Sequence, residues 1–159
     1  MYKRILVPLE NSKTDESIIG HVIQLARSCR ASVVLIHVAD GFAARNMKQL
    51  GLRESEEIQK DRLYIESIAD RIEAQGLEAD AIIASGDPAK EIIDAAGREH
   101  CDLIAMGTHG HKFLNDLIRG SVADSVRHNT MIPVLLVRAP NRATPALGVA
   151  AVPRKAEQT

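Results

Sequence analysis

Three glycines in the second half of the chain are spaced so that they could build a site for an anion. They are Gly107, Gly110 and Gly120, in the pattern G-x2-G-x9-G, and Ser121 follows the last one directly. Glycine lets a ligand approach the backbone and lets successive N–H groups point into one concavity. A helix that begins at Ser121 would add the unpaired amides of its first turn, including that of Val122, at its positive dipole end. The pattern predicts an anion cradle, with phosphate as the favoured anion, unless the glycines only serve turns of a long loop.

Other site chemistries are weak or missing in the sequence. The phosphate loop G-x4-G-K-[ST], the dinucleotide fingerprint G-x-G-x-x-G and the nucleophile elbow G-x-S-x-G do not occur. His109 and His111 form an H-x-H pair, which can bind zinc, but no Cys, Asp or Glu stands beside them to complete a ligand set. We therefore expect no metal site and no catalytic residue, and we assign His109 a ligand-side or solvent role.

Hydrophobic periodicity predicts the scaffold that must hold these residues. Five short apolar runs lack polar alternation, as is typical of strands covered on both faces of a parallel sheet. They are residues 5–8, 32–38, 79–84, 103–106 and 133–137. Between them lie stretches of helical period, apart from residues 41–55, which have no clean period. The order predicts an α/β fold, a three-layer α/β/α sandwich around a five-stranded parallel sheet, with ligands beyond the carboxyl ends of the strands.

Local signals mark several helix ends. Capping patterns predict helix starts at three places: Ser12 with Asp15, Asp87 before Pro88, and Ser121 with Asp124. Gly76 and Gly97 lie near the ends of two predicted helices, where a positive φ is often needed. His37 lies inside an apolar run, and we interpret it as a hydrogen-bonded structural residue.

Composition limits the classes of protein. The 159 residues suit one domain, which we place at 1–138, followed by a flexible basic tail at 139–159. Twenty basic against 21 acidic residues leave no large basic field for nucleic acid, and 3% aromatic residues argue against base stacking. No apolar stretch approaches the length of a membrane span, and the start does not fit a signal peptide. Cys29 and Cys101 form no CxxC pair, so we expect free thiols and a cytoplasmic location.

Four blocks of sequence together resemble the universal stress protein family. They are Ile5–Ser12 (ILVPLENS), Leu35–Val38 (LIHV), Gly86–Ile93 (GDPAKEII) and the G-x2-G-x9-G-S pattern that begins at Gly107. The blocks occur in the family's order and with its separations, from about residue 2 to residue 138. The intact glycine pattern is similar to that of the family's ATP-binding branch.

The resemblance implies a fold, a ligand and a site. The fold is adenine nucleotide alpha-hydrolase-like, with strand order 3-2-1-4-5 and the nucleotide over the gap between strands one and four. The implied cofactor is ATP or AMP, with Mg²⁺ as an accompanying ion. The implied nucleotide-binding residues, with His109 added as a neighbour of the phosphates, are Pro8, Leu9, Glu10, Val38, Met106, Gly107, His109, Gly110, Gly120, Ser121 and Val122.

The same resemblance raises one question and one further expectation. The binding branch usually has Asp where this chain has Glu10, so a carboxylate is kept on one more methylene, and affinity or ligand preference can change. Strand 133–138 is expected at a sheet edge, where an apolar strand invites pairing with another chain. Members of the family dimerise there, so a homodimer through this strand is expected.

Three hypotheses for function follow. The first is a nucleotide-binding stress-response or regulatory sensor that hydrolyses ATP slowly at most. The second is an enzyme of nucleotide or phosphoryl transfer on the same fold. The third is a nucleotide-free interaction module in which Glu10 has abolished binding. The sequence names neither the physiological nucleotide nor the downstream partner.

Overall fold

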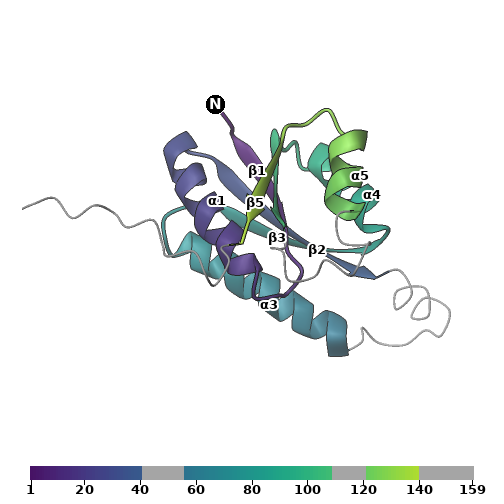
Figure 1. The fold of residues 1–159 in the computed structure, drawn as a ribbon. Helices are drawn as coiled ribbons and strands as arrows, with labels where there is room; N and C mark the ends of the chain where they lie inside the picture. Colours follow the sequence, from purple (N-terminus) through teal and green to yellow (C-terminus); the bar gives the residue numbers. More distant parts are fainter. Residues whose placement is uncertain (41–55, 109–120, 140–159) are drawn as a thin grey trace, which may run out of the picture.

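The computed structural model of the chain describes residues 1–40, 56–108 and 121–139 (Figure 1). Within these ranges five strands alternate with four helices. The strands are β1 (Arg4–Pro8), β2 (Ser32–Asp40), β3 (Ala79–Gly86), β4 (Leu103–Thr108) and β5 (Val134–Arg138). The helices are α1 (Asp15–Cys29), α3 (Glu56–Glu73), α4 (Pro88–Arg98) and α5 (Ser121–Asn129). The segment 41–55, the residues His109, Gly110 and Gly120, and tail residues 140–159 lie outside the described residues.

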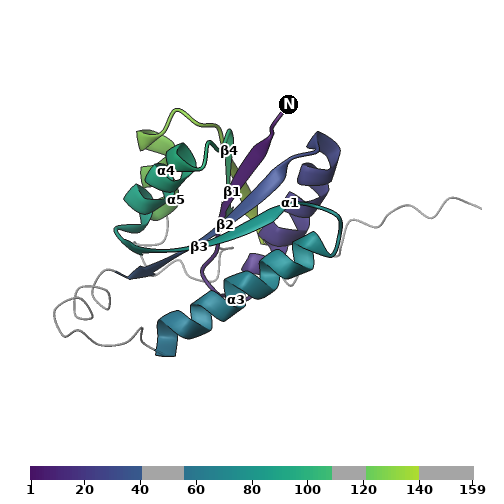
Figure 2. The ribbon, with the colours of Figure 1, turned by 180° about the vertical axis from the view of Figure 1, so that it is seen from behind.

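The strands form one parallel sheet in the order β3-β2-β1-β4-β5, as expected. Helices α1 and α3 cover one face, and α4 and α5 cover the other (Figures 1 and 2). The three-layer sandwich and its strand order are therefore confirmed. The order places β1 in the centre and makes β3 and β5 the edges of the described sheet.

The central strand feeds both halves of the core. Successive side chains of β1 point to opposite faces, so Ile5 and Val7 pack beneath α1 and α3 while Leu6 packs beneath α4 and α5. All three are fully buried. The expectation of strands covered on both faces holds for the inner strands. It fails in part for β3 and β5, which have exposed residues because they are edge strands.

One predicted helix cap is confirmed and another is wrong. Asp87 is the N-cap of α4, and its carboxylate accepts a hydrogen bond from the Lys90 amide (2.9 Å). The predicted Ser12 cap is wrong, because α1 begins at Asp15 with Thr14 as an N-cap that makes no side-chain bond. The Ser12–Asp15 pair is joined in the other direction: the Asp15 carboxylate accepts from the Ser12 amide (3.1 Å).

The helix ends also correct one prediction. Gly76, which follows α3, has a φ of 81°, as expected for a left-handed turn residue. Gly97 instead lies within the last turn of α4, and the positive φ falls on His100 (54°). Helix α5 begins at Ser121 as predicted, and Asp124 in its first turn pairs with Arg127 (3.3 Å).

Candidate functional site

The candidate site lies at the carboxyl edge of the sheet, where the winding direction reverses. From β1 the chain winds outward through β2 to β3, and it then returns to β4 on the other side of β1. Loops that leave β1 and β4 therefore turn toward opposite faces, α1 packing on one and α5 on the other. Such a switch point is where open α/β sheets bind ligands.

Pro8 ends the ladder between β1 and β4. The backbone N–H and C=O groups of successive strand residues point alternately to the two neighbouring strands. In β1 and just after it, the Leu9 amide donates to Ile36 of β2 (2.9 Å), whereas the Arg4 carbonyl accepts from Asp102, just before β4 (3.0 Å). Pro8 is thus on the β4 side, where its missing N–H removes a ladder donor. β1 pairs with β2 at all five positions but with β4 at two positions near the strand starts. Pairing at the switch point therefore stops before the strands end.

The loop after β1 is fixed through its backbone. Leu9 is buried, and its carbonyl accepts a hydrogen bond from His37 Nδ1 (2.9 Å). Glu10 is exposed, and its amide donates to Asp15 Oδ1 (3.3 Å). Asn11 has a φ of 58°, in the left-handed region that Asn tolerates better than most residues. The structure thus places the predicted residues Pro8, Leu9 and Glu10 together at the switch point.

Val38 supplies backbone groups on the opposite side of this loop. Because the Ile36 carbonyl faces β1 and alternate residues face the same neighbour, the N–H and C=O of Val38 also lie on the β1 side of β2. The Val38 side chain is half-buried and packs on the core beneath α4. Val38 therefore offers one donor and one acceptor at the carboxyl edge, as the edge of a flat heterocycle would require.

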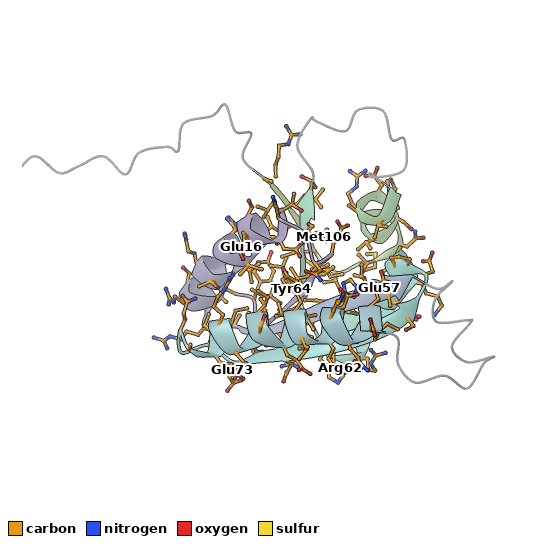
Figure 3. The ribbon with its side chains drawn as sticks, turned by 90° about the horizontal axis from the view of Figure 1, so that it is seen from below. Glu16, Glu57, Arg62, Tyr64, Glu73 and Met106 are labelled. Carbon is orange, nitrogen blue, oxygen red and sulfur yellow. The ribbon has the colours of Figure 1, made fainter. Side chains whose placement is uncertain are left out.

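Met106 and Gly107 form the β4 side of the site. Met106 is buried in the core beneath α4 and α5 (Figure 3). Gly107 is exposed, and a Cβ built on it would lie 3.7 Å from Cγ2 of Ile18 in α1. A side chain at this position would stand at the switch point against α1. The absence of one leaves the backbone approachable there.

Helix α5 brings its first turn to the same edge. It leads from the carboxyl end of β4 to the amino end of β5, so Ser121 and Val122 lie toward the carboxyl edge. Val122 is half-buried against the core on that face. The first amides of a helix have no partners within it and carry a partial positive charge. His109, Gly110 and Gly120, predicted for the same loop, lie outside the described residues.

The sequence reasoning missed a set of polar residues behind the β1–α1 loop. Asp61 accepts from Asn11 Nδ2 (3.0 Å) and lies 3.1 Å from His37 Nε2. Tyr64 donates to Asp15 Oδ2 (2.9 Å), which is buried at 4% exposure. The structural role predicted for His37 is confirmed by these contacts. The available signal was the spacing of Asp61 and Tyr64, which share a helix face with buried Ile65 and Ile68.

The electrostatics of this set follow from burial. Burial and the neighbouring Asp15 carboxylate raise the pKa of Tyr64 well above its usual value. The phenol therefore stays protonated and donates a hydrogen bond to Asp15. Among the described residues no group of three or more His, Cys, Asp or Glu side chains is arranged to hold a metal ion. None of the described helices is both long enough and apolar enough to cross a bilayer.

The fold is that of a doubly wound α/β protein, and its topological switch point is the candidate ligand site. The profile of the universal stress protein family matches residues 1–138, and the chain belongs to this family. It is 32% identical to the universal stress protein MJ0577 of Methanocaldococcus jannaschii, over 89% of this chain and 98% of that protein. The solved structure of MJ0577 superposes with a TM-score of 0.70, covering 89% of this chain and 99% of that one.

Two further solved structures share the fold at lower identity. One is the universal stress protein of Archaeoglobus fulgidus in complex with dAMP, at 21% identity and a TM-score of 0.64, covering 86% of this chain and 98% of that one. The other is a universal stress protein in complex with cAMP, at 17% identity and a TM-score of 0.62, covering 87% and 98%. At these identities the likeness concerns the fold.

Proposed function

We propose that this chain is a cytoplasmic regulatory protein that binds one adenine nucleotide, ATP or AMP, at the switch point between β1 and β4. The observation that carries the proposal is the joint geometry of the β1 and β4 ends. Pro8 stops the ladder, Gly107 leaves the β4 backbone approachable, and the first turn of α5 lies toward the same edge. Family membership supports the ligand class, and relatives of the same fold have been solved with dAMP and with cAMP.

In the proposed binding mode the adenine lies toward β2 and the phosphates lie toward α5. The Val38 backbone reads the adenine edge, and the loop from Pro8 to Glu10 contacts the nucleoside. The amides at Ser121 and Val122 hold the phosphates, with Met106 packed beneath. We include His109, Gly110 and Gly120, which stand between β4 and α5 in the sequence, on the phosphate side of the proposal.

Glu10 gives the proposed site its particular character. The carboxylate remains within reach of ribose hydroxyls, but its extra methylene moves the acceptor and adds a rotatable bond to be ordered. We infer weaker ribose binding than an Asp would give, with the phosphate contacts retained. Mg²⁺ would accompany ATP through the phosphates themselves, since this cation is commonly bound through substrate oxygens.

Calorimetric titration with ATP, ADP, AMP and cyclic AMP tests the function. Saturable binding of at least one of them supports the proposal, and no binding at millimolar concentration contradicts it. Gly107→Val places a branched side chain at the switch point and should weaken binding by about tenfold or more, equivalent to about 1.4 kcal/mol. Gly20→Val is the control, because Gly20 is exposed on α1 with nothing within 4 Å of a built Cβ.

Turnover of labelled ATP separates the sensor from an enzyme. The proposal predicts less than about one turnover per minute, far below the roughly 10 s⁻¹ median of enzymes. Many turnovers per minute would favour a nucleotide or phosphoryl transfer enzyme on the same fold.

We also infer a homodimer through strand 133–138.

A further inference from the structure

We propose that Asp61 and Tyr64 of α3 are positioning residues for the nucleoside half of the site. They do not contact the ligand themselves. They hold the β1–α1 loop, here defined as residues 9–12, in the shape that binds it. The inference rests on the proposed function and extends it to a helix that contributes none of the nucleotide contacts.

We call the contacts from Asp61 and Tyr64 to the loop the α3 clamp, and each of the two residues begins one arm of it. The first arm begins at Asp61. One carboxylate oxygen accepts from the side-chain amide of Asn11 (3.0 Å), and the other faces His37 Nε2 (3.1 Å). His37 in turn donates from Nδ1 to the Leu9 carbonyl (2.9 Å). The His37 and Asp61 side chains are only 13% and 15% exposed. Asp61 thus reaches the loop at two points, directly at Asn11 and through the imidazole at Leu9.

The second arm begins at Tyr64, one helical turn further along α3. Its hydroxyl donates to Oδ2 of the buried Asp15 (2.9 Å). Figure 3 shows Tyr64 on the side of α3 that faces the sheet and α1. The same carboxylate accepts from the amides of Glu10 (3.3 Å) and Ser12 (3.1 Å). Together the two arms fix the backbone of the loop from Leu9 to Ser12.

The contacts also decide which half of a nucleotide this loop can hold. The buried Asp15 carboxylate already accepts from the amides of Glu10 and Ser12, so these N–H groups are not offered to a phosphate. A negative charge beneath the loop further disfavours an anion there. The clamp should therefore govern the nucleoside end and leave the phosphate end, at α5, unaffected.

This division gives a test that simple loss of stability cannot imitate. Asp61→Leu keeps the approximate size and removes both polar contacts. Asp61→Asn keeps an oxygen for Asn11 and presents an NH₂ that can donate to a neutral His37 ring. Tyr64→Phe removes one hydroxyl. Arg71→Gln is the matched control, since Arg71 also joins α3 to α1, but its two side-chain hydrogen bonds (2.9 and 3.0 Å) go to Glu16 and not to residues 9–12.

Calorimetry with adenosine, AMP and inorganic tripolyphosphate reads the effect at each end. We expect Asp61→Leu and Tyr64→Phe to weaken adenosine and AMP roughly tenfold, and tripolyphosphate by less than about twofold. Asp61→Asn and Arg71→Gln should bind all three ligands nearly as the parent chain does. Amide NMR signals of residues 9–12 should shift in the first two variants without ligand.

Three results would overturn the inference. Unchanged adenosine affinity in Asp61→Leu and Tyr64→Phe would remove the positioning role while leaving the proposed function intact. Equal losses for adenosine and tripolyphosphate, shared by Arg71→Gln, would assign the residues a general structural role. A parent chain that binds neither adenosine nor any adenine nucleotide would overturn the proposed function, and the positioning role with it.

Discussion

Among single residues, the two cysteines differ in burial, from which a difference in reactivity can be predicted. Cys101 is 6% exposed, and burial, with the Glu99 and Asp102 charges, raises its pKa to about 11 despite the nearby Arg4. At pH 8 only about 0.1% of a thiol with such a pKa is the reactive thiolate. Cys29 is half-buried, and both cysteines are free.

We predict that a thiol reagent at pH 8 modifies one cysteine per native chain quickly and Cys101 much more slowly. Because the thiolate forms as pH rises toward 11, the slow reaction should accelerate with pH. Cys29→Ala should abolish the fast phase. Two fast phases in the parent chain would contradict the prediction.

A second prediction at the residue scale concerns the cap of α4. Asp87→Ala removes the acceptor of the Lys90 amide and should lower the free energy of unfolding by about 1 kcal/mol. Asp94→Ala is its control, because Asp94 makes an exposed ion pair with Lys90 whose loss should change stability by less than about 0.5 kcal/mol. Urea denaturation of both variants measures the difference. Equal losses would show that the cap bond is not the cause.

At the scale of elements, helix α3 is held to the sheet by one face. Ile65 is fully buried, whereas Leu63, two residues earlier, is 68% exposed. We predict that Ile65→Ala lowers the free energy of unfolding by about 2–5 kcal/mol, since it removes core contacts and leaves a cavity. Leu63→Ala should change it by less than about 0.5 kcal/mol. Thermal and urea unfolding would check both predictions. A large fall in the free energy of unfolding for Leu63→Ala would contradict the second prediction and indicate that Leu63 makes a contact outside the described core.

The elements also explain how far sequence could lead. Apolar runs and helical stripes were sufficient for the strands, their layers and the Asp87 cap, because those signals are local. The direction of the Ser12–Asp15 bond and the place of the left-handed residue at His100 depend on packing geometry, which spacing does not specify. The α3 clamp joins Tyr64 to Asp15, and such distant pairs leave no local pattern. Gly107 was predicted from the glycine spacing after a strand, whereas Pro8 was assigned to the candidate site only through the resemblance to the family.

For the whole molecule, the sheet edges decide how copies can meet. β5 bonds to β4 through Pro133 and Ala139, so alternate backbone groups, those of Val134, Leu136 and Arg138, face away from the sheet. Leu136 is 41% exposed in the middle of this edge. A two-fold axis near Leu136 would pair two such edges in antiparallel fashion and bury both leucines.

We therefore predict a dimer, with a mass in light scattering near twice the 17.3 kDa of one chain at micromolar concentration. Leu136→Lys places two like charges near the axis and removes two leucines whose burial would contribute about 1.5–3 kcal/mol each. The dissociation constant of the dimer should therefore rise by at least about a hundredfold. Met131→Lys is the control, since Met131 is 99% exposed before β5 and should leave the dimer intact. A monomeric parent chain, or a Leu136→Lys variant as dimeric as Met131→Lys, would exclude pairing through this edge.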